Sequence, residues 1–372
     1  MTFYLAPFFL ATIFALFFTP LIRIIAQTNK IVDSPAPRKI HSKPIPLLGG
    51  LAVFLAFTVT TVIFWYFGYI SDAKITNLHI LAILAAGLIL MIGGFLDDKY
   101  SLKPSRQFIF PLMAIILVIA AGVRIQFITN PLGGVLKFPV ELGLFLTFFW
   151  LLGMVYTTKF LDGLDGLAAG VTAIGSLIIF IVSLSWDVAG SGTSVLALIL
   201  AGSCLGFLAF NWHPAKIFLG EGGSVFCGFM LGILAIISGS KIATALLIMG
   251  IPILDVIWVI GRRIWQGSSP TKPDAKHLHF RLLDIGLTQR QAVVFLYFLT
   301  TAFGITSLFL QSKGKVIALL LLTLFMIALA IGLVLVYRFK DKTNKIKMIF
   351  LLLAIILILI IIILTIFFSG AA

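Results

Sequence analysis

The stretch LHILAILAAGLILMIGGFLDDKYSLKPSR, residues 78–106, decides the class of fold. Its first part, 78–96, is almost entirely apolar and is long enough to cross the hydrocarbon core of a bilayer, which takes about 20 residues of helix. Two adjacent acids, Asp97 and Asp98, follow at once, and three cations come after them. An apolar run of this length that ends on charged residues is typical of a transmembrane helix that ends at the membrane surface.

Runs of the same kind recur along the whole chain, which has 372 residues and is 61% hydrophobic but only 11% charged. Soluble domains carry about a quarter charged residues. A water-soluble fold is therefore excluded, as is intrinsic disorder, which requires low hydrophobicity. Both cysteines lie in apolar runs, which argues against a disulfide framework or a zinc site. We predict an all-α polytopic membrane protein. About twelve transmembrane helices are expected, near residues 3–22, 47–68, 78–96, 108–122, 141–158, 167–185, 194–211, 223–238, 242–261, 291–310, 316–337 and 347–368.

The distribution of charge predicts the orientation. Lys and Arg outnumber Asp and Glu by 27 to 13, a formal net charge of +14. If the spans alternate in direction, 21 of the 27 cations fall on one side. The positive-inside rule makes that side cytoplasmic, with both termini outside, and accounts for the basic excess without a nucleic-acid partner. The cytoplasmic loops are then 23–46, 97–107, 159–166, 212–222 and 262–290.

Acids and imidazoles gather on the same side. They are Asp97, Asp98, Asp162, Asp165, Glu221, His41, His213, His277 and His279. Such a mixture of charges at one membrane face indicates a site for a charged, soluble substrate. A transporter or flippase of lipid-linked sugars, the alternative from another class, should instead carry its charges along a path near the bilayer midplane.

Two pairs of acids have informative spacing. Asp97 and Asp98 are neighbours and diverge by about 100° on a helix. One is expected to work on the substrate while a nearby Lys or Arg holds the other; simple acid–base pairing at a helix end is the structural alternative. Asp162 and Asp165 are three apart and are expected to share a face. Acids at a bilayer boundary are costly unless a cation, a metal or water compensates them, although helix capping would also explain this second pair.

A glycine-rich turn, GEGGS (220–224), precedes an apolar span. Its flexible backbone N–H groups would suit an anion at a helix N-terminus. Glu221 within it could equally coordinate a hard cation through its carboxylate oxygens.

The longest polar loop, 261–286, contains HLHFRL (277–282). His277, His279 and Arg281 suit phosphate contacts, while the His spacing and the lack of a nearby Cys argue against zinc. A membrane-anchoring loop would explain the cations of this loop but not the paired histidines.

Three further polar positions have weaker signals. Asp255 lies within a span, so it is a functional candidate or a structural partner of Arg262 or Arg263. Trp212 and His213 are expected at the membrane interface without a catalytic role.

Together these motifs carry a resemblance. Five motifs occur in order over most of residues 20–310: DSPAPRKIHSKPIPLLGG (33–50), the DD pair, DGLDGLA (162–168), FN with PAKIFLGEGGS (210–224) and HLHFRL. The chain resembles the polyprenyl-phosphate N-acetylhexosamine-1-phosphate transferases, and is most similar to the undecaprenyl-phosphate N-acetylglucosamine-1-phosphate branch. The resemblance implies a ten-helix transferase core within 1–312, followed by two extra helices within 313–372.

The resemblance also implies a reaction. A sugar-1-phosphate, with N-acetylglucosamine as the default sugar, would pass from a UDP-sugar to undecaprenyl phosphate with release of UMP, as the first membrane step of a cell-surface glycan pathway. Magnesium, with manganese as an alternative, would be the cofactor. The protein would lie in the bacterial cytoplasmic membrane, with its active face toward the cytoplasm. Membrane lipid is a further partner, a homodimer is compatible with the sequence, and the pathway and the amino sugar stay open.

The family's pattern assigns roles to residues of this chain. Asp97 would deprotonate the lipid phosphate, with Asp98 beside it and Asp162 among the catalytic acids. Asp165, Asn211 and Phe218 would hold uracil, and Glu221 would bind the metal. Lys159, His277, His279 and Arg281 would complete the substrate-binding set.

Three departures from that pattern fall in the same site. Lys159 stands where the family usually has Asn, Glu221 replaces the usual Asp, and Phe280 replaces a further His. Our interpretation is a variant subgroup in which Lys159 itself offsets phosphate charge and the metal has fewer protein ligands. An inactive scaffold of the same fold is the alternative.

Overall fold

The computed structural model describes residues 2–35, 41–72, 74–186, 191–239, 241–267 and 277–338. Ten of the described helices are long and apolar enough to cross a membrane, which confirms the prediction of an all-α polytopic membrane protein. The last expected span, 347–368, lies outside the described residues. The total number of spans and the boundary expected at residue 312 therefore stay predictions.

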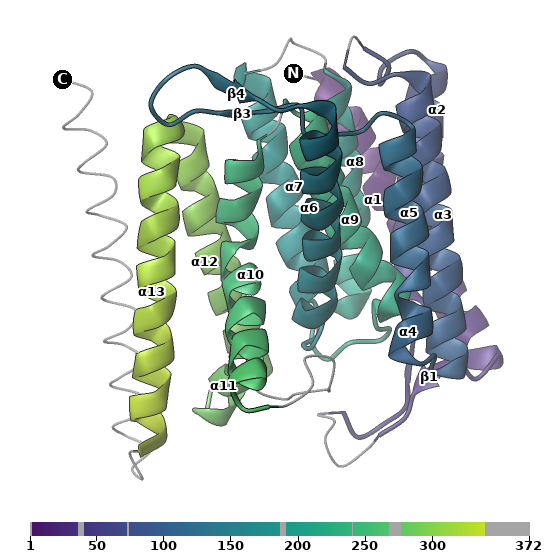
Figure 1. The fold of residues 1–372 in the computed structure, drawn as a ribbon. Helices are drawn as coiled ribbons and strands as arrows, with labels where there is room; N and C mark the ends of the chain where they lie inside the picture. Colours follow the sequence, from purple (N-terminus) through teal and green to yellow (C-terminus); the bar gives the residue numbers. More distant parts are fainter. Residues whose placement is uncertain are drawn as a thin grey trace. The chain divides into compact units, whose positions relative to one another are not determined.

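The described chain forms two compact units. The first comprises the described residues of Met1–Ile128 and Leu136–Lys241, and the second comprises those of Thr129–Val135 and Ile242–Ala372. The helices of the first unit are α1 (Thr2–Thr28), α2 (Gly49–Tyr66), α3 (Asn77–Tyr100), α4 (Pro104–Gln107), α5 (Ile109–Ala120), α6 (Val140–Leu161), α7 (Leu167–Trp186), α8 (Gly192–Asn211) and α9 (Gly220–Ile237). Those of the second are α10 (Ile242–Trp265), α11 (Leu278–Asp284), α12 (Gln289–Phe309) and α13 (Ser312–Arg338). Figure 1 labels each of them.

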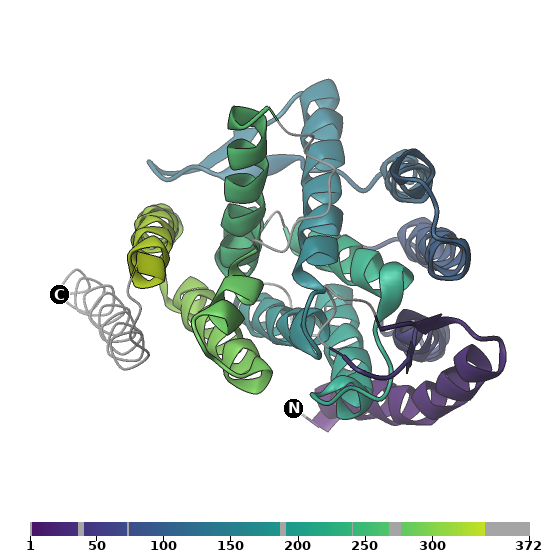
Figure 2. The ribbon, with the colours of Figure 1, turned by 90° about the horizontal axis from the view of Figure 1, so that it is seen from below.

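Helix α9 lies in the interior of the first unit. All of its residues except Glu221 are buried, and it packs against α2, α3, α6 and α7. Figure 2, the view from below, shows α2, α3 and α5 nearly end-on and standing in a row, and α9 packs against α3. Helix α9 is therefore buried inside the bundle. By contrast, α5 leaves Ile109, Met113 and Ile116 exposed.

Small residues bring α9 close to its neighbours. A Cβ atom added to Gly50 of α2 would overlap Gly223 of α9, and one added to Gly94 of α3 would overlap Gly222. In a bilayer no hydrophobic force drives helices together, because lipid tails are as apolar as leucine, so close packing of backbones has to hold them. The pairs Gly50–Gly223 and Gly94–Gly222 thus set the distance between α9 and the two helices beside it.

The first polar loop is tied to the start of α9. Strand β1 (Val32–Asp33) pairs with strand β2 (Ile45–Pro46) in an antiparallel ladder. The N–H of Phe218 donates to Pro46 O (2.8 Å), and the N–H of Gly49 donates to Phe218 O (2.9 Å). Two motifs that lie far apart in sequence are therefore hydrogen-bonded to each other. A second two-stranded sheet, of β3 (Phe127–Thr129) and β4 (Val135–Lys137), joins α5 to α6.

We expect Gly94→Ala to destabilise the protein, because the new methyl group would meet the backbone of Gly222 and push α3 away from α9. The loss should be about 1–3 kcal/mol, typical of overpacking, and should lower the Tm of the detergent-purified protein. The matched control is Gly153→Ala in α6, where an added Cβ has no neighbour within 4 Å. Equal Tm values for the two variants would contradict this account of the packing.

Candidate active site

The acids at the end of α3 have different partners. Asp97 Oδ1 accepts hydrogen bonds from the N–H of Leu102 (2.7 Å) and from Gln107 Nε2 (2.9 Å). Asp98 Oδ1 accepts from the N–H of Glu221 (3.1 Å). The divergence expected of adjacent residues on a helix is therefore observed. A Lys or Arg was expected to hold one of the two acids. The donors of these hydrogen bonds are instead backbone N–H groups and the side-chain amide of Gln107.

The glycine-rich turn is the first turn of α9 and not a flexible segment before it. Gly220 has φ +75°, a left-handed conformation that glycine adopts readily. A Cβ there would overlap the carboxylate of Asp98. The N–H at the start of α9 thus binds an anion, as predicted for a helix N-terminus, but that anion is Asp98 of the chain itself.

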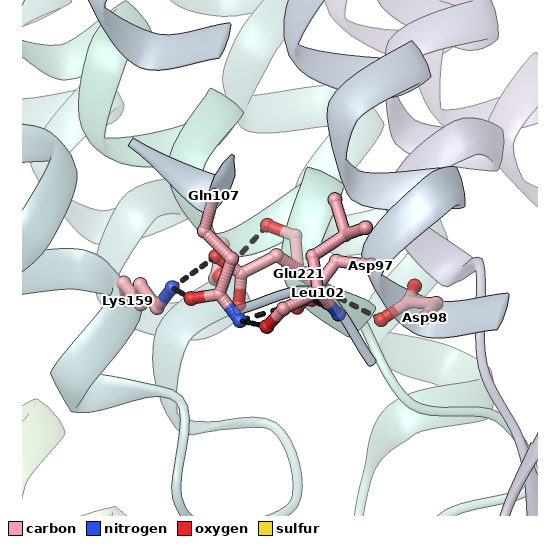
Figure 3. Close-up of polar contacts among 7 residues, drawn as sticks. Asp97, Asp98, Leu102, Gln107, Lys159 and Glu221 are labelled. Atoms are coloured by element: carbon pink, nitrogen blue, oxygen red, sulfur yellow. Dashed lines mark hydrogen bonds and ion pairs between the residues drawn. The ribbon is translucent and has the colours of Figure 1, made fainter. Parts of the chain in front are cut away.

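A ring of polar contacts joins four helices. Lys159 Nζ forms an ion pair with Glu221 Oε1 and donates to Gln107 Oε1 (2.9 Å). Gln107 in turn donates to Asp97, and Glu221 donates through its backbone to Asp98. Figure 3 shows Gln107 between Lys159 and Asp97. We call Asp97, Asp98, Gln107, Lys159 and Glu221 the Lys159 ring; its members come from α3, α4, α6 and α9.

Asp162 lies directly after α6, beside this ring. Burial, and after it the negative charges of Glu221, Asp98 and Asp165, raises the pKa of Asp162 from its ordinary value of 3.8 to about 8. Its carboxyl group is therefore largely protonated at neutral pH. A protonated acid adds no charge to a crowded set of carboxylates and can donate a hydrogen bond.

Asp165 turns to a different partner from Asp162. Its Oδ2 is 2.7 Å from His213 Nδ1 and also accepts from the N–H of Ala215 (3.0 Å). Because a carboxylate accepts, the Nδ1 of His213 carries the proton. His213, to which the sequence assigned no role beyond the membrane interface, thus positions an acid that the sequence placed in the substrate site. Its signal was its place in the FNWHPAK motif.

Asn211 is used by the fold. Its Nδ2 donates to Ile217 O (2.9 Å), and its Oδ1 accepts from the N–H of Gly166 (2.9 Å). The side chain is buried and joins the DGLDG turn to the segment before α9. In this structure Asn211 supports the site rather than facing it. Phe218 is half-buried and packs edge-on against His41 at 5.4 Å, and His41 pairs with Asp33 (2.9 Å).

The predicted phosphate loop lies in the second unit. Asp255 Oδ2 is 2.9 Å from His277 Nδ1, and Asp255 Oδ1 accepts from the N–H of Leu278 (2.9 Å). Asp255 is therefore a partner of the histidine loop, and the pairing expected with Arg262 or Arg263 stays a prediction. His279 is buried, and burial lowers its pKa to about 3, with the charge of His277 as a second cause. His279 thus stays neutral at physiological pH. Arg281 lies one turn further along α11.

The acids of the first unit do not form a ready metal site. Within the described residues, no group of three or more His, Cys, Asp or Glu side chains is placed to hold a metal ion. Glu221, the predicted metal ligand, is paired with Lys159, and one oxygen each of Asp97 and Asp98 is held by groups of the chain. Magnesium prefers several oxygen ligands in octahedral geometry. The donor set as arranged does not fit such an ion.

Comparison with known proteins establishes the family. The model of glycosyl transferase family 4 matches residues 80–239. The chain is 34% identical over 316 residues to the probable undecaprenyl-phosphate N-acetylglucosaminyl 1-phosphate transferase of Bacillus subtilis (strain 168), covering 82% of this chain and 84% of that protein. The chain belongs to glycosyl transferase family 4. The predicted resemblance is thereby confirmed.

Two other family 4 relatives have similar coverage. The decaprenyl-phosphate N-acetylglucosaminephosphotransferase of Mycolicibacterium smegmatis is 31% identical over 83% of both chains. The undecaprenyl-phosphate alpha-N-acetylglucosaminyl 1-phosphate transferase of Escherichia coli (strain K12) is 29% identical over 78% of both. All five residues of the Lys159 ring fall within the family 4 match at 80–239, whereas His277 and His279 lie beyond it.

The raised pKa of Asp162 predicts a pH dependence of stability. The folded pKa of about 8 lies above the ordinary 3.8, so folding takes up a proton between these values and stability falls as the pH rises through this range. We expect the Tm to fall between pH 5 and pH 8, and to fall less in Asp162→Asn, which has no proton to lose. Thermal unfolding at several pH values measures this, and an identical slope in the variant would contradict the assignment.

Asn211→Ala should lower stability, because it removes the hydrogen bonds of the side chain to the buried N–H of Gly166 and C=O of Ile217. The expected cost is about 1–3 kcal/mol per buried group, read as a lower Tm. Exposed Asn29, whose amide donates to Ile25 O at the end of α1, provides the control Asn29→Ala. An unchanged Tm together with a raised KM for the nucleotide sugar would instead make Asn211 a substrate contact.

Proposed function

We propose that the chain transfers a sugar-1-phosphate, with N-acetylglucosamine-1-phosphate as the first candidate, from a UDP-sugar to undecaprenyl phosphate and releases UMP. One observation carries the proposal. The acids that the sequence placed in the catalytic set, Asp97, Asp98 and Asp162, gather with a cation at one end of the helices of a family 4 chain. The relatives named above are transferases of this class.

The proposed step is a displacement at phosphorus. An oxygen of the acceptor phosphate attacks the phosphorus that bears the sugar, and a new P–O bond forms. The bond from that phosphorus to the bridging oxygen breaks, and UMP leaves with the electron pair. Asp97 takes any proton held by the acceptor phosphate, through the carboxylate oxygen that Leu102 and Gln107 leave available.

The charges of the site favour such a substrate only if the acids are compensated. A diphosphate next to several carboxylates would be repelled, and phosphoryl transfer needs positive charge near the leaving group. Protonation of Asp162 and pairing of Glu221 with Lys159 both reduce the negative charge of the site. The cation of Lys159 supports the choice of a nucleotide sugar.

The arrangement favours an enzyme over a transporter. Asp98, Lys159 and Glu221 all lie within the last or first turn of their helices and not midway along them. Most Lys and Arg residues of the chain are expected at this end, so we propose that it faces the cytoplasm of a bacterial cell. A soluble nucleotide sugar and a lipid phosphate could both reach it there.

UMP release tests the proposal. The full chain in nanodiscs is incubated with UDP-N-acetylglucosamine and undecaprenyl phosphate, and both UMP and labelled lipid are measured. Wild type should form them in equal amounts, and Asp98→Asn should lower the rate by at least about a hundredfold, the size typical of lost electrostatic or acid–base catalysis. A screen of other UDP-sugars identifies the preferred donor. Binding of donor without UMP release from any of them would instead support the scaffold.

A further inference from the structure

Lys159 occupies the place in the site where a separate cation would be expected. Its ammonium contacts the carboxylate of Glu221 and the amide oxygen of Gln107, and it lies 5.8 Å from the centre of the Tyr156 ring. The side chains of Lys159 and Glu221 are about four-fifths buried, at 19% and 20% exposure. A lysine held on three sides is a built feature rather than a solvated surface charge.

The ammonium still has capacity for a ligand. A lysine has three N–H donors and no acceptor. Among the described residues, Glu221 and Gln107 take two of these donors. The third donor and the exposed fraction of the side chain leave room for one phosphate oxygen. Because Glu221 and Gln107 fix the nitrogen, binding of that oxygen would require little reorganisation.

Two unusual positions of the sequence meet in this pair. Lys159 and Glu221 are both departures from the pattern of the transferases that the chain resembles, and the structure places them in direct contact. One oxygen each of Asp97 and Asp98 is also held by a group of the chain.

We propose that Lys159 replaces a divalent cation at Glu221, so that its ammonium binds the donor diphosphate and offsets the charge that develops on the departing UMP. This inference rests on the proposed transfer reaction. Lys159 transfers no proton or electron in this step, so the balance of the displacement is unchanged. Gln107 is a positioning residue, since it holds both Lys159 and Asp97.

Removal of metal tests the proposal in the full chain. The rate of UMP release from wild type in EDTA should stay within about threefold of its rate in magnesium, as expected if a fixed ammonium supplies the charge. Lys159→Gln should lose at least about a hundredfold in both conditions, the cost typical of removing one electrostatic group. The control is Lys99→Gln, which alters an exposed lysine at the end of α3 and should behave as wild type.

A second readout does not depend on turnover. Binding of Mn²⁺ is measured by electron paramagnetic resonance in the absence of nucleotide, on wild type and on the double variant Lys159→Asn with Glu221→Asp. Wild type should bind no Mn²⁺ at the site, whereas the double variant, freed of the ammonium, should bind one ion and require magnesium for activity. Size-exclusion profiles and Tm values verify that each variant is folded.

The outcomes separate the two proposals. Loss of wild-type activity in EDTA with recovery in magnesium, or one tightly bound Mn²⁺ in wild type, would overturn the role of Lys159. If no UDP-sugar gives UMP in any condition, the transfer reaction fails. The binding measurement then still decides whether Lys159 excludes a metal ion from Glu221.

Discussion

The ion pair between Lys159 and Glu221 is the interaction on which the rest of the site depends. Removing carboxylates from water is costly, and a buried acid without a partner costs several kcal/mol (about 3–5 when one member of a buried pair is removed). Asp98, Asp162 and Glu221 lie near enough to raise the energy of one another's charged forms. One ammonium, held by Glu221 and Gln107, permits such a cluster to exist at the edge of a membrane.

The backbone has to place these groups before the pair can form. Glu221 reaches Lys159 only because α9 begins beside Asp98, and α9 can begin there only because Gly220 has no side chain in the way. The glycines that follow bring α9 against α2 and α3. Close helix packing and the position of the charges are thus consequences of the same four-residue stretch, GEGG. A substitution that shifts α9 would therefore act on the site without touching a polar group.

Sequence reasoning found the spans and the acids but missed how the acids are held. Apolar runs of about 20 residues predict the helices. Because the acids lie at the ends of such runs, the same pattern predicts that they gather at helix ends. Gln107 had no signal, because a lone glutamine after a short polar loop is chemically ordinary. Its role arises from a contact with Lys159 across 52 positions of the chain. Likewise, the glycines of residues 220–223 were expected to form a flexible anion-binding turn. Composition does not reveal that neighbouring helices fill the space beside these glycines.

Local hydrogen bonding also explains the roles of Asn211, a substrate candidate, and of His213, which was expected only at the membrane interface. An asparagine or histidine near an acid motif suggests a ligand contact. The sequence alone does not distinguish a side chain that faces the substrate from one that bonds to the rest of the chain. Both ends of the Asn211 amide form hydrogen bonds with the backbone, at Gly166 and Ile217, and Nδ1 of His213 forms one with Asp165. Each of them fixes the DGLDG turn that carries Asp162. Precise placement of that acid therefore depends on side chains that need not touch the substrate. The same holds for Asp255, which orients His277 through a contact that the sequence alone did not predict.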